Sequence, residues 1–308
     1  MRGKLLSVVI PNYNRAEAVV RAVKSIGERE DIEIVIVDDG SEPSVYSELA
    51  KALQGFGNIA LSRNEKNIGL VRNWNECLRR ATGEWICLLC SDDYFREGAV
   101  GRILEQVSRA APCLILQDPG IEQDTLLLKG GPECSARIRL PFASGNVWHS
   151  SIYARLGGFD EEIKYSPDAE YWYRIAASYD VLLVRESFAE YVCHQGNYMW
   201  QTWLKDDFLD QIRLLARKNA RHRLRAADDG DTTEIERRAV LETIETMLQA
   251  SAAASRREQL AKALSLSREY GAPRSKRIAA IKTYAIGKLG IPELRNRLGA
   301  MKRRLLTR

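Results

Sequence analysis

The chain has 308 residues, of which 45% are hydrophobic and 28% are charged, a composition typical of globular rather than disordered proteins. No apolar run approaches the roughly 20 residues that a membrane-spanning helix needs, and the first residues lack a signal-peptide pattern. Six scattered cysteines are typical of reduced thiols, and the pair Cys87 and Cys90 lacks the further ligands of a zinc site. We therefore predict a cytoplasmic protein with one large core or two domains.

The formal net charge of +5 hides an asymmetry along the chain. Residues 213–308 contain 23 Lys and Arg against 10 Asp and Glu, whereas residues 1–212 contain 23 against 31. This contrast predicts two parts of different character.

Strand-like and helical segments alternate through the first part of the chain. The predicted strands are the apolar runs at 5–10, 32–37, 59–61, 85–89 and 113–116, and helical periodicity covers 14–26, 43–53, 70–81 and 98–110. Asn14 followed by Glu17 predicts a capping box at the first helix. The alternation predicts an α/β fold with a mostly parallel sheet and flanking helices.

The pattern changes after residue 117. Residues 118–145 contain several Gly and Pro and predict loops and short strands, followed by a helix from Ser166 or Asp168 to Ser178 and strands at 181–184 and 188–193. Beyond Trp200 the chain has helical character, with breaks at 228–231, 271–273 and 290–292. We predict a domain over residues 1–200 and a basic helical region over residues 201–308.

Pairs of acids follow two of the predicted strands. Asp38 and Asp39 end one apolar run, and Asp92 and Asp93 end another, in the stretch EWICLLCSDDY. In open α/β sheets the carboxyl ends of strands face the ligand crevice, and adjacent carboxylates there suit a hard cation that bridges to phosphate. The alternative is a solvated turn, because Ser-Asp-Asp is also good turn chemistry.

Two common phosphate-binding classes are excluded by their missing motifs. The loop after the first strand lacks G-x-G-x-x-G, and no G-x-x-x-x-G-K-[ST] occurs in the chain, which argues against dinucleotide-dependent dehydrogenases and P-loop enzymes. A sugar nucleotidyltransferase is likewise disfavoured, because the Gly-rich loop that it needs is missing after the first strand.

Several motifs taken together resemble one known family. In chain order they are SVVIPNYNRA, IVIVDDGS, NEKNIGLVRNWN, EWICLLCSDD, LGGFDE and a segment beginning SPDAEYWYRIA. This series, over about residues 5–197, resembles the family 2 glycosyltransferases of GT-A fold. One departure is Cys90, which stands where the family often has the first acid of Asp-x-Asp-Asp.

The resemblance implies a donor site for a nucleoside diphosphate sugar. By this likeness Pro11 and Tyr13 line the base pocket, Asp39 accepts the base N3–H, and Arg72 contacts the diphosphate. Asp92 holds the ribose or assists the metal, and Asp93 ligates Mg²⁺ or Mn²⁺, with His194 near the metal or diphosphate. A solvated helical position is the alternative for Arg72, and an ordinary loop residue for His194.

The resemblance also implies a catalytic base. Asp168 falls where the family's base stands, with Pro167 in place of the usual Glu and with Glu170 as the alternative carboxylate. A base is needed because an alcohol is a poor nucleophile until its proton is being removed. A helix-capping role is the alternative for Asp168. Asn146 and His149, with Trp148, are the candidates for an acceptor pocket.

The implied function is an inverting, metal-dependent glycosyltransferase. It would move a sugar from a nucleoside diphosphate donor, most simply a UDP-sugar, to a hydroxyl of a saccharide or lipid-linked saccharide in polysaccharide biosynthesis. The alternative is a non-catalytic nucleotide-sugar-binding or scaffold protein of the same fold.

The end of the chain predicts a location. Residues 274–308 hold eleven Lys and Arg and a single acid, Glu293, interleaved with apolar residues at near-helical spacing. Such a basic amphipathic segment fits an anionic membrane surface, so we expect a peripheral position on the inner face of the cytoplasmic membrane. Packing on the catalytic domain is the alternative, and nucleic-acid binding is disfavoured by the near absence of aromatic residues.

Overall fold

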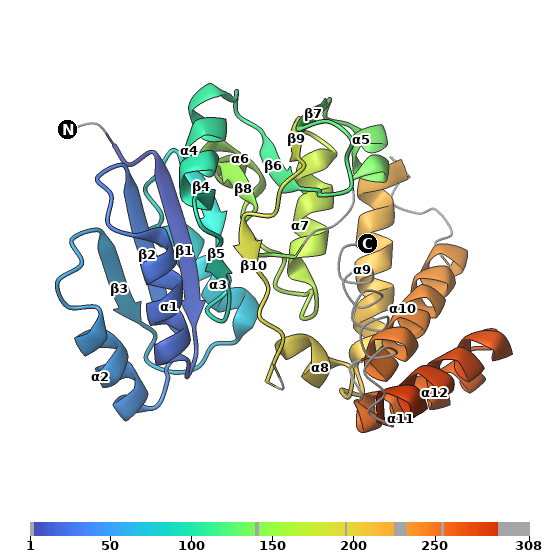
Figure 1. Cartoon of the computed structure of the whole chain (residues 1–308). Coiled ribbons are helices and arrows are strands. Elements are labelled where there is room, and N and C mark those ends of the chain that lie inside the picture. The colour runs from blue at the N-terminus through green and yellow to red at the C-terminus, as the bar shows by residue number, and fades with distance from the viewer. Residues whose placement is uncertain (1–2, 139–141, 195, 225–232, 254–255, 289–308) are drawn as a thin grey trace. The chain divides into compact units, whose positions relative to one another are not determined.

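The computed structural model describes residues 3–138, 142–194, 196–224, 233–253 and 256–288. It divides into two compact units, Met1–Val192 and Cys193–Arg308, which are drawn together in Figure 1. The division falls near the predicted boundary after residue 200.

An eight-stranded sheet forms the centre of the first unit, in the order β3-β2-β1-β4-β8-β6-β9-β7. Six strands run in one direction, and β8 and β7 run against them. The bounds are β1 (Leu6–Asn12), β2 (Ile32–Asp38), β3 (Ile59–Arg63), β4 (Trp85–Leu88), β6 (Leu114–Gln117), β7 (Thr125–Leu128), β8 (Val147–His149) and β9 (Val181–Val184). Two short antiparallel strands, β5 (Tyr94–Phe95) and β10 (Ala189–Glu190), form a second sheet.

Helices cover both faces of the large sheet, because its strands carry apolar side chains on both sides. One face packs against α1 (Ala16–Ile26), α2 (Pro43–Ala52) and α4 (Ala99–Arg109). The other packs against α3 (Leu70–Arg80), α5 (Pro132–Arg137), α6 (Ser150–Leu156) and α7 (Pro167–Ala176).

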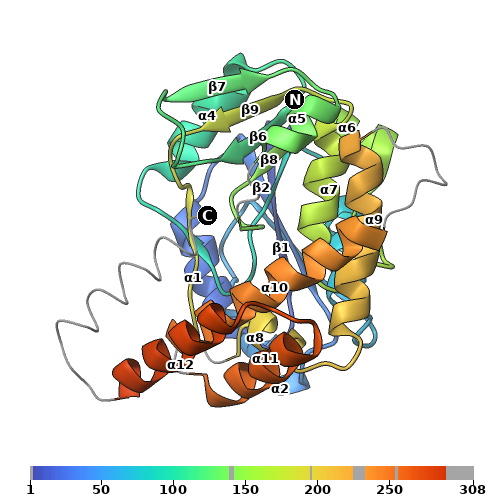
Figure 2. The same cartoon turned by 90° about the vertical axis from the view of Figure 1, so that its right-hand side faces the viewer.

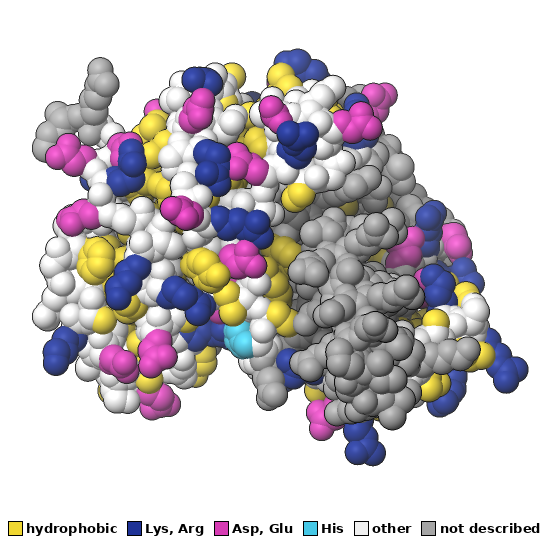
Figure 3. All heavy atoms as spheres, in the orientation of Figure 1, with side chains coloured by type: hydrophobic (Ala, Val, Ile, Leu, Met, Phe, Trp, Pro, Cys, Tyr) yellow, Lys and Arg dark blue, Asp and Glu magenta, His cyan; other side chains and the backbone are white. Residues whose placement is uncertain are grey.

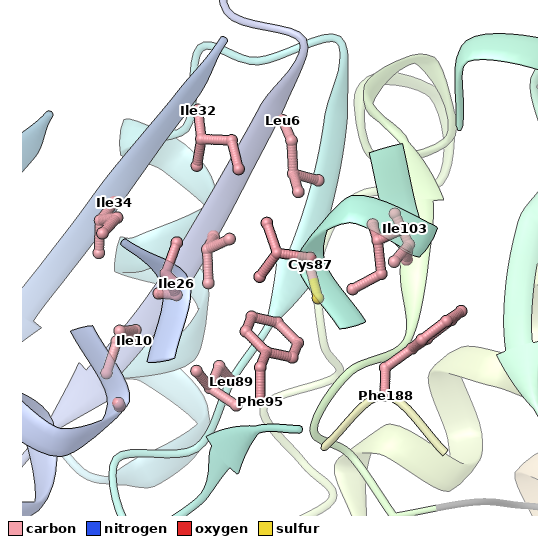
Figure 4. Packing of buried hydrophobic residues seen from close by; sticks show 14 of the residues in the cluster. Leu6, Ile10, Ile26, Ile32, Ile34, Cys87, Leu89, Phe95, Ile103 and Phe188 are labelled. Carbon is pink, nitrogen blue, oxygen red and sulfur yellow. The ribbon is translucent and has the colours of Figure 1, made fainter. Parts of the chain in front are cut away.

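Strict alternation along the strands sorts side chains between the two faces. On β1, Leu6 and Ile10 belong to the cluster drawn in Figure 4, whereas Val9 belongs to the cluster on the opposite face. On β4, Cys87 joins the first cluster and Ile86 the second, because successive side chains of a strand point to opposite sides. Packing on both faces thus fixes the backbone of the strands that lead to the acids after β2 and β4.

The second unit is helical over its described residues and can be followed in Figure 2. Its elements are α8 (Tyr198–Thr202), α9 (Phe208–Leu224), α10 (Thr233–Ala253), α11 (Arg257–Glu269) and α12 (Arg274–Lys288), with α10 contacting α9, α11 and α12. The predicted breaks at 228–231 and 290–292, and the tail beyond residue 288, lie outside the described residues. No helix of the described part is both long and apolar enough to cross a membrane.

The α/β class, the mostly parallel sheet and the helical second part are confirmed, but two local predictions are wrong. Asn14 does not cap α1: it has φ 54°, and its side chain accepts the Glu42 N–H while its own N–H donates to Ser41 Oγ. The predicted strand at 188–193 is reduced to Ala189–Glu190, which pairs with β5 rather than joining the large sheet.

On the face shown in Figure 3, basic and acidic side chains of the first unit are interspersed rather than gathered by sign. The acidic excess of this part of the sequence is therefore not a single patch on that face.

Candidate active site

The polar residues of the candidate site gather at the carboxyl ends of neighbouring strands in the large sheet. Because β2, β1 and β4 are parallel neighbours, their carboxyl ends lie side by side, and these ends lead into Asp39, Tyr13 and Asp92. The antiparallel strand β8 begins at the same end of the sheet, since Val147 is paired with Cys87 and the Gly145 N–H donates to the Leu88 carbonyl.

Asp39 is buried and holds the loop that precedes α3. Its Oδ1 accepts hydrogen bonds from Asn64 Nδ2 and the Ile68 N–H, each at 2.9 Å, and its Oδ2 accepts the Gly69 N–H at 3.0 Å. A carboxylate has about four acceptor positions, so one position on Oδ2 remains for a ligand. The neighbouring Gly40 has φ 69°, and a Cβ there would lie 2.7 Å from the main chain of Lys66 and Asn67.

The hydrogen bonds of Asp38 hold the turn after β2. It is fully buried, and its carboxylate accepts from Asn12 Nδ2 at 2.7 Å and from the N–H and hydroxyl of Ser41 at 3.0 and 2.5 Å. These bonds shape the turn that presents Asp39.

Asp93 is only 2% exposed and is held by two distant segments. The Ser144 hydroxyl donates to Oδ2 at 2.5 Å, and the Val192 N–H donates to Oδ1 at 3.0 Å. Pairing of Glu190 with Tyr94 brings the second segment alongside the acid. Burial raises the pKa of Asp93 to about 6, although both hydrogen bonds act in the opposite direction.

Asp92 lies in the same turn, is partly buried and faces α1. Its Oδ2 pairs with Arg15 Nη1 at 2.6 Å, and its carbonyl oxygen accepts from Arg21 Nη2 at 2.6 Å. Arginine thus balances the charge of one of the two adjacent carboxylates.

Asp168 lies in the first turn of α7. The preceding Ser166 has the left-handed conformation, with φ 57°, and Pro167 opens the helix. The helix is positioned by Tyr171 and Trp172, which pack on Trp148 with ring centroids 5.7 and 5.3 Å away. Burial raises the pKa of Asp168 to about 6, opposed by the main-chain N–H groups of the first turn.

Cys90 lies in the turn that carries Asp92 and Asp93. Burial raises its pKa well above the usual range, and the charges of Asp93, Asp92 and Asp168 raise it further. The Cys90 N–H also donates to Ser144 Oγ at 3.0 Å, which joins it to Asp93 through the same hydroxyl.

Glu170 is engaged within its own helix. It is buried, and its carboxylate pairs with Arg174 at 2.8 Å, while Arg174 also donates to the carbonyls of Leu156 and Gly158. These contacts fix the LGGFDE segment to α7, and a catalytic role for Glu170 stays a prediction.

The residues expected around the nucleotide differ in exposure. Pro11 is buried within β1, whereas Tyr13 is 46% exposed just beyond the strand end. Arg72 is on the exposed side of α3 and pairs with Glu161 at 3.0 Å. A diphosphate contact of Arg72 stays a prediction.

Asn146 and His149 do not meet at one place. Asn146 is fully buried, accepts from Gln117 and donates to the Phe142 carbonyl, so it ties together the loop before β8. His149 is paired with Trp85 at the opposite end of β4 from the acids, because β8 runs antiparallel, and its Nδ1 caps α6. An acceptor role for either side chain stays a prediction.

His194 belongs to the second unit. Its N–H donates to Asn197 Oδ1 at 2.5 Å, and its Nδ1 accepts the Gly196 N–H at 3.0 Å. A role in metal binding stays a prediction.

A divalent ion fits the donor set of the β4 turn. Asp93 uses one acceptor position on each oxygen and keeps the others, and Asp92 lies beside it. Mg²⁺ and similar ions are commonly held by one or two carboxylates together with substrate phosphates. The described residues contain no cluster of three or more His, Cys, Asp or Glu suited to a metal.

Sequence reasoning missed the partners of these acids. Arg15 directly follows the PNYN motif and Arg21 lies in the helix after it, and these two basic residues were the available signal. Ser144 and the Val192 main chain had no signal, because their contacts with Asp93 depend on tertiary structure alone.

Comparison with known families gives a match for the first part of the chain. Residues 7–139 match the sequence profile described as Glycosyl transferase family 2. Among curated proteins, the succinoglycan biosynthesis protein ExoU of Rhizobium meliloti is 33% identical over 32% of this chain and 29% of its own length. A GalNAc(5)-diNAcBac-PP-undecaprenol beta-1,3-glucosyltransferase of Campylobacter jejuni is 28% identical over 39% of this chain and 41% of its own.

A third relative, an uncharacterised protein of Mycobacterium tuberculosis, is 27% identical over 56% of this chain and 61% of its own. This chain therefore matches between 29% and 61% of the length of these three relatives.

Solved structures share the fold at low sequence identity. S. aureus TarS 1-349 in complex with UDP-GlcNAc aligns with TM-score 0.57 and 16% identity over 93% of this chain and 92% of that chain. Mannosyltransferase PcManGT from Pyrobaculum calidifontis, in complex with GDP-Man and Mn²⁺, aligns with TM-score 0.54 and 16% identity over all of this chain and 86% of that one. The predicted GT-A-like fold is thereby confirmed.

Proposed function

We propose that this protein transfers a sugar from a nucleoside diphosphate sugar to a saccharide hydroxyl, because residues 7–139 match the profile described as Glycosyl transferase family 2. The observation that carries the proposal is the clamped carboxylate of Asp93, which lies beside Asp92 at the carboxyl end of β4. Transfer needs a site for a leaving diphosphate, which we assign to this pair, and a base, which we assign to Asp168 in the first turn of α7.

The nucleoside is assigned to the ends of β1 and β2. Tyr13 offers an exposed ring, and Asp39 Oδ2 retains an acceptor position for an imide N–H. A hydrogen bond to an ionised acceptor is stronger than one between neutral groups, so Asp39 favours a base with such a donor, as uracil has.

The diphosphate is assigned to the β4 turn, where Asp93 and Asp92 would hold Mg²⁺ or Mn²⁺. Neutralisation of charge on the leaving diphosphate is the chemistry that a bound ion supplies. The structure of PcManGT is a complex with GDP-Man and Mn²⁺, which supports a divalent ion here.

Asp168 is assigned the role of the base. The acceptor oxygen attacks the anomeric carbon as its proton passes to the Asp168 carboxylate, and the bond from that carbon to the phosphate oxygen breaks with its electron pair on the nucleoside diphosphate. A single displacement of this kind inverts the anomeric centre. With a pKa of about 6, Asp168 is ionised at neutral pH and still basic enough to take a proton.

Two measurements test the proposed function. A thermal-shift panel of UDP-, GDP- and dTDP-sugars with Mn²⁺ should identify the donor, since a ligand at about 100 times its Kd stabilises the folded state by about 2.7 kcal/mol. Transfer from that donor to saccharide acceptors should then be catalytic. A donor that stabilises the protein without any turnover would favour the alternative of a non-catalytic nucleotide-sugar-binding protein.

The acceptor and location are proposed as a lipid-linked saccharide at a membrane surface. The C. jejuni relative carries an undecaprenol-linked substrate in its name, and α12 exposes Ile278 and Ile281 among basic residues. Flotation with liposomes should show binding that increases with anionic lipid content and falls with salt. Equal recovery with neutral and anionic liposomes would remove the membrane proposal.

A further inference from the structure

Two aromatic rings stack beside the acidic turn. Phe142 and Tyr191 have ring centroids 4.3 Å apart and planes inclined by 7°. Phe142 remains 36% exposed, and neither ring is part of the two hydrophobic clusters that the described residues form on the sheet. An exposed stacked pair outside the core needs a reason other than core packing.

Each ring is tied to Asp93 by its own segment. Phe142 lies two residues before Ser144, whose hydroxyl donates to one oxygen of Asp93. Tyr191 lies one residue before Val192, whose N–H donates to the other oxygen. The two segments that clamp the carboxylate therefore also carry the two rings.

The loop that presents Phe142 is held rigidly. The buried Asn146 side chain donates to the Phe142 carbonyl at 2.7 Å and accepts from Gln117, while the Gly145 N–H donates to Leu88 at 2.8 Å. A ring placed on such a loop is preorganised, which lowers the entropic cost of binding a ligand.

Position along the sheet separates this pair from the nucleoside site. The strand order places β2 and β1 on one side of β4 and places β8, β6 and β9 on the other. Asp39 and Tyr13 follow β2 and β1, whereas Phe142 precedes β8 and Tyr191 follows β10, which pairs with β5 just after Asp93. Through Phe142 the stack therefore lies on the β8 side of Asp93, away from the strands that lead to the base, where an attacking acceptor must lie if the diphosphate occupies the β4 turn.

We propose that the Phe142–Tyr191 stack is the binding platform for the acceptor, and that the acceptor places the apolar C–H face of a pyranose ring on Phe142. This assignment rests on the proposed function, because it takes Asp93 as the diphosphate site. An aromatic ring without polar atoms recognises the face of a sugar rather than its hydroxyl pattern. The pair thus supplies affinity and orientation, while other groups select the sugar.

The direct test is saturation-transfer NMR on the full chain without donor. The probes are the methyl pyranosides of glucose, galactose, mannose and N-acetylglucosamine, each with wild type, Phe142→Leu, Phe142→Tyr and Tyr191→Leu. Leu127→Ala on β7 is a matched control, because Leu127 is also an exposed apolar side chain, at 52%. Unchanged melting temperatures confirm that each variant is folded.

We expect saturation of the ring C–H protons of at least one pyranoside by wild type, Phe142→Tyr and Leu127→Ala. With Phe142→Leu the signal should fall about fivefold or more, as expected for loss of an aromatic contact. Loss with Tyr191→Leu as well would reflect the unsupported Phe142 ring. Saturation transfer that is equal in Phe142→Leu and wild type, or absent from wild type with every pyranoside, would overturn the platform.

Measuring the acceptor KM separately from donor affinity and donor hydrolysis distinguishes the acceptor platform from the proposed sugar transfer. With the donor identified by thermal shift, Phe142→Leu should raise the KM for the saccharide acceptor roughly tenfold, while donor hydrolysis by water and donor affinity stay unchanged. A structural role for the stack alone would lower donor affinity as well, because the Asp93 clamp would loosen. Failure of wild type to bind any nucleotide sugar would contradict the proposed function without bearing on the pyranoside NMR result.

Discussion

The main-chain N–H of Val192 donates a hydrogen bond of 3.0 Å to Oδ1 of Asp93, across 99 positions of the chain. A second bond, from the Ser144 hydroxyl 51 positions away, holds the other oxygen. The carboxylate is thereby oriented and almost removed from water, and its burial raises its pKa to about 6. Keeping such a buried acid ionised costs free energy, and a bound cation would offset that cost.

This cost predicts that Asp93→Asn stabilises the protein without ligands at alkaline pH. The folded-state pKa of about 6 exceeds the unfolded value near 3.8, so the stabilising contribution of Asp93 is complete below about pH 4 and is lost as the pH rises through 6. The rise of the pKa from 3.8 to about 6 bounds the effect at about 3 kcal/mol. Calorimetric melting at pH 8 should show a Tm about 2–6 °C above wild type, with no gain at pH 4.

The exposed carboxylate of Asp124 provides the control. Asp124→Asn should leave the difference between pH 4 and pH 8 unaltered, since this side chain is 87% exposed. A lower Tm for Asp93→Asn than for wild type at pH 8 would contradict a buried, energetically strained carboxylate.

Transfer should depend on pH through Asp168. A base must be ionised to accept the acceptor proton, and burial raises the pKa of Asp168 to about 6. At saturating donor and Mn²⁺, the single-turnover rate should therefore fall about tenfold per pH unit below 6 and level off above it. Rapid-quench measurements between pH 5 and 8 would reveal this, and a rate that is flat over the range would exclude Asp168 as the base.

Asp168→Asn extends this prediction. The rate should fall by about 10²–10⁴ with little change in donor affinity, and the dependence on pH near 6 should disappear. Glu105→Gln, an exposed carboxylate on α4, should behave as wild type. A loss of less than severalfold for Asp168→Asn would assign the side chain to helix capping.

Asp39→Asn should loosen the loop before α3. An amide cannot replace a carboxylate that accepts from Asn64, Ile68 and Gly69, because its NH₂ group would face a donor. We expect a loss of about 1–3 kcal/mol in the free energy of unfolding, measured with urea, and faster hydrogen exchange at Ile68 and Gly69. Asp31→Asn, at an exposed ion pair with Arg29, is the control; equal exchange in both variants would mean that Asp39 does not anchor the loop.

Arg15→Gln should strengthen binding of Mn²⁺ in the absence of nucleotide. The guanidinium pairs with Asp92 at 2.6 Å and so competes with a cation for the same carboxylate. Electron paramagnetic resonance of free Mn²⁺ should show an affinity increase of at least about threefold, with a stability change below about 1 kcal/mol because the pair is partly exposed. Lys24→Gln at the other end of α1 should have no such effect, and weaker binding by Arg15→Gln would refute the competition.

The sequence predicts those parts of the site that depend on local pattern. Apolar runs that stop at acids locate the strand ends, so this pattern alone assigns Asp39 and Asp93 to the correct edge of the sheet. Pro167 and the aromatic run after it likewise locate the start of α7.

Features that depend on strand direction or on distant segments are beyond this pattern. His149 was expected near the acceptor, but β8 runs antiparallel to β4 and places it opposite Trp85. Asn14 has good capping chemistry, yet its amide instead holds the turn at Glu42 because tertiary contacts outweigh a local preference. Partners such as Ser144 come from a loop without periodicity.

The most direct test of a metal and diphosphate site at Asp93 is calorimetric titration. The identified nucleotide sugar is titrated, with and without Mn²⁺, into wild type and Asp93→Ala. The predicted result is binding to wild type that strengthens at least about tenfold with Mn²⁺, and a loss of this metal effect in Asp93→Ala while metal-free binding persists. Equal enhancement by Mn²⁺ in both proteins would contradict the assignment of the donor diphosphate to Asp93.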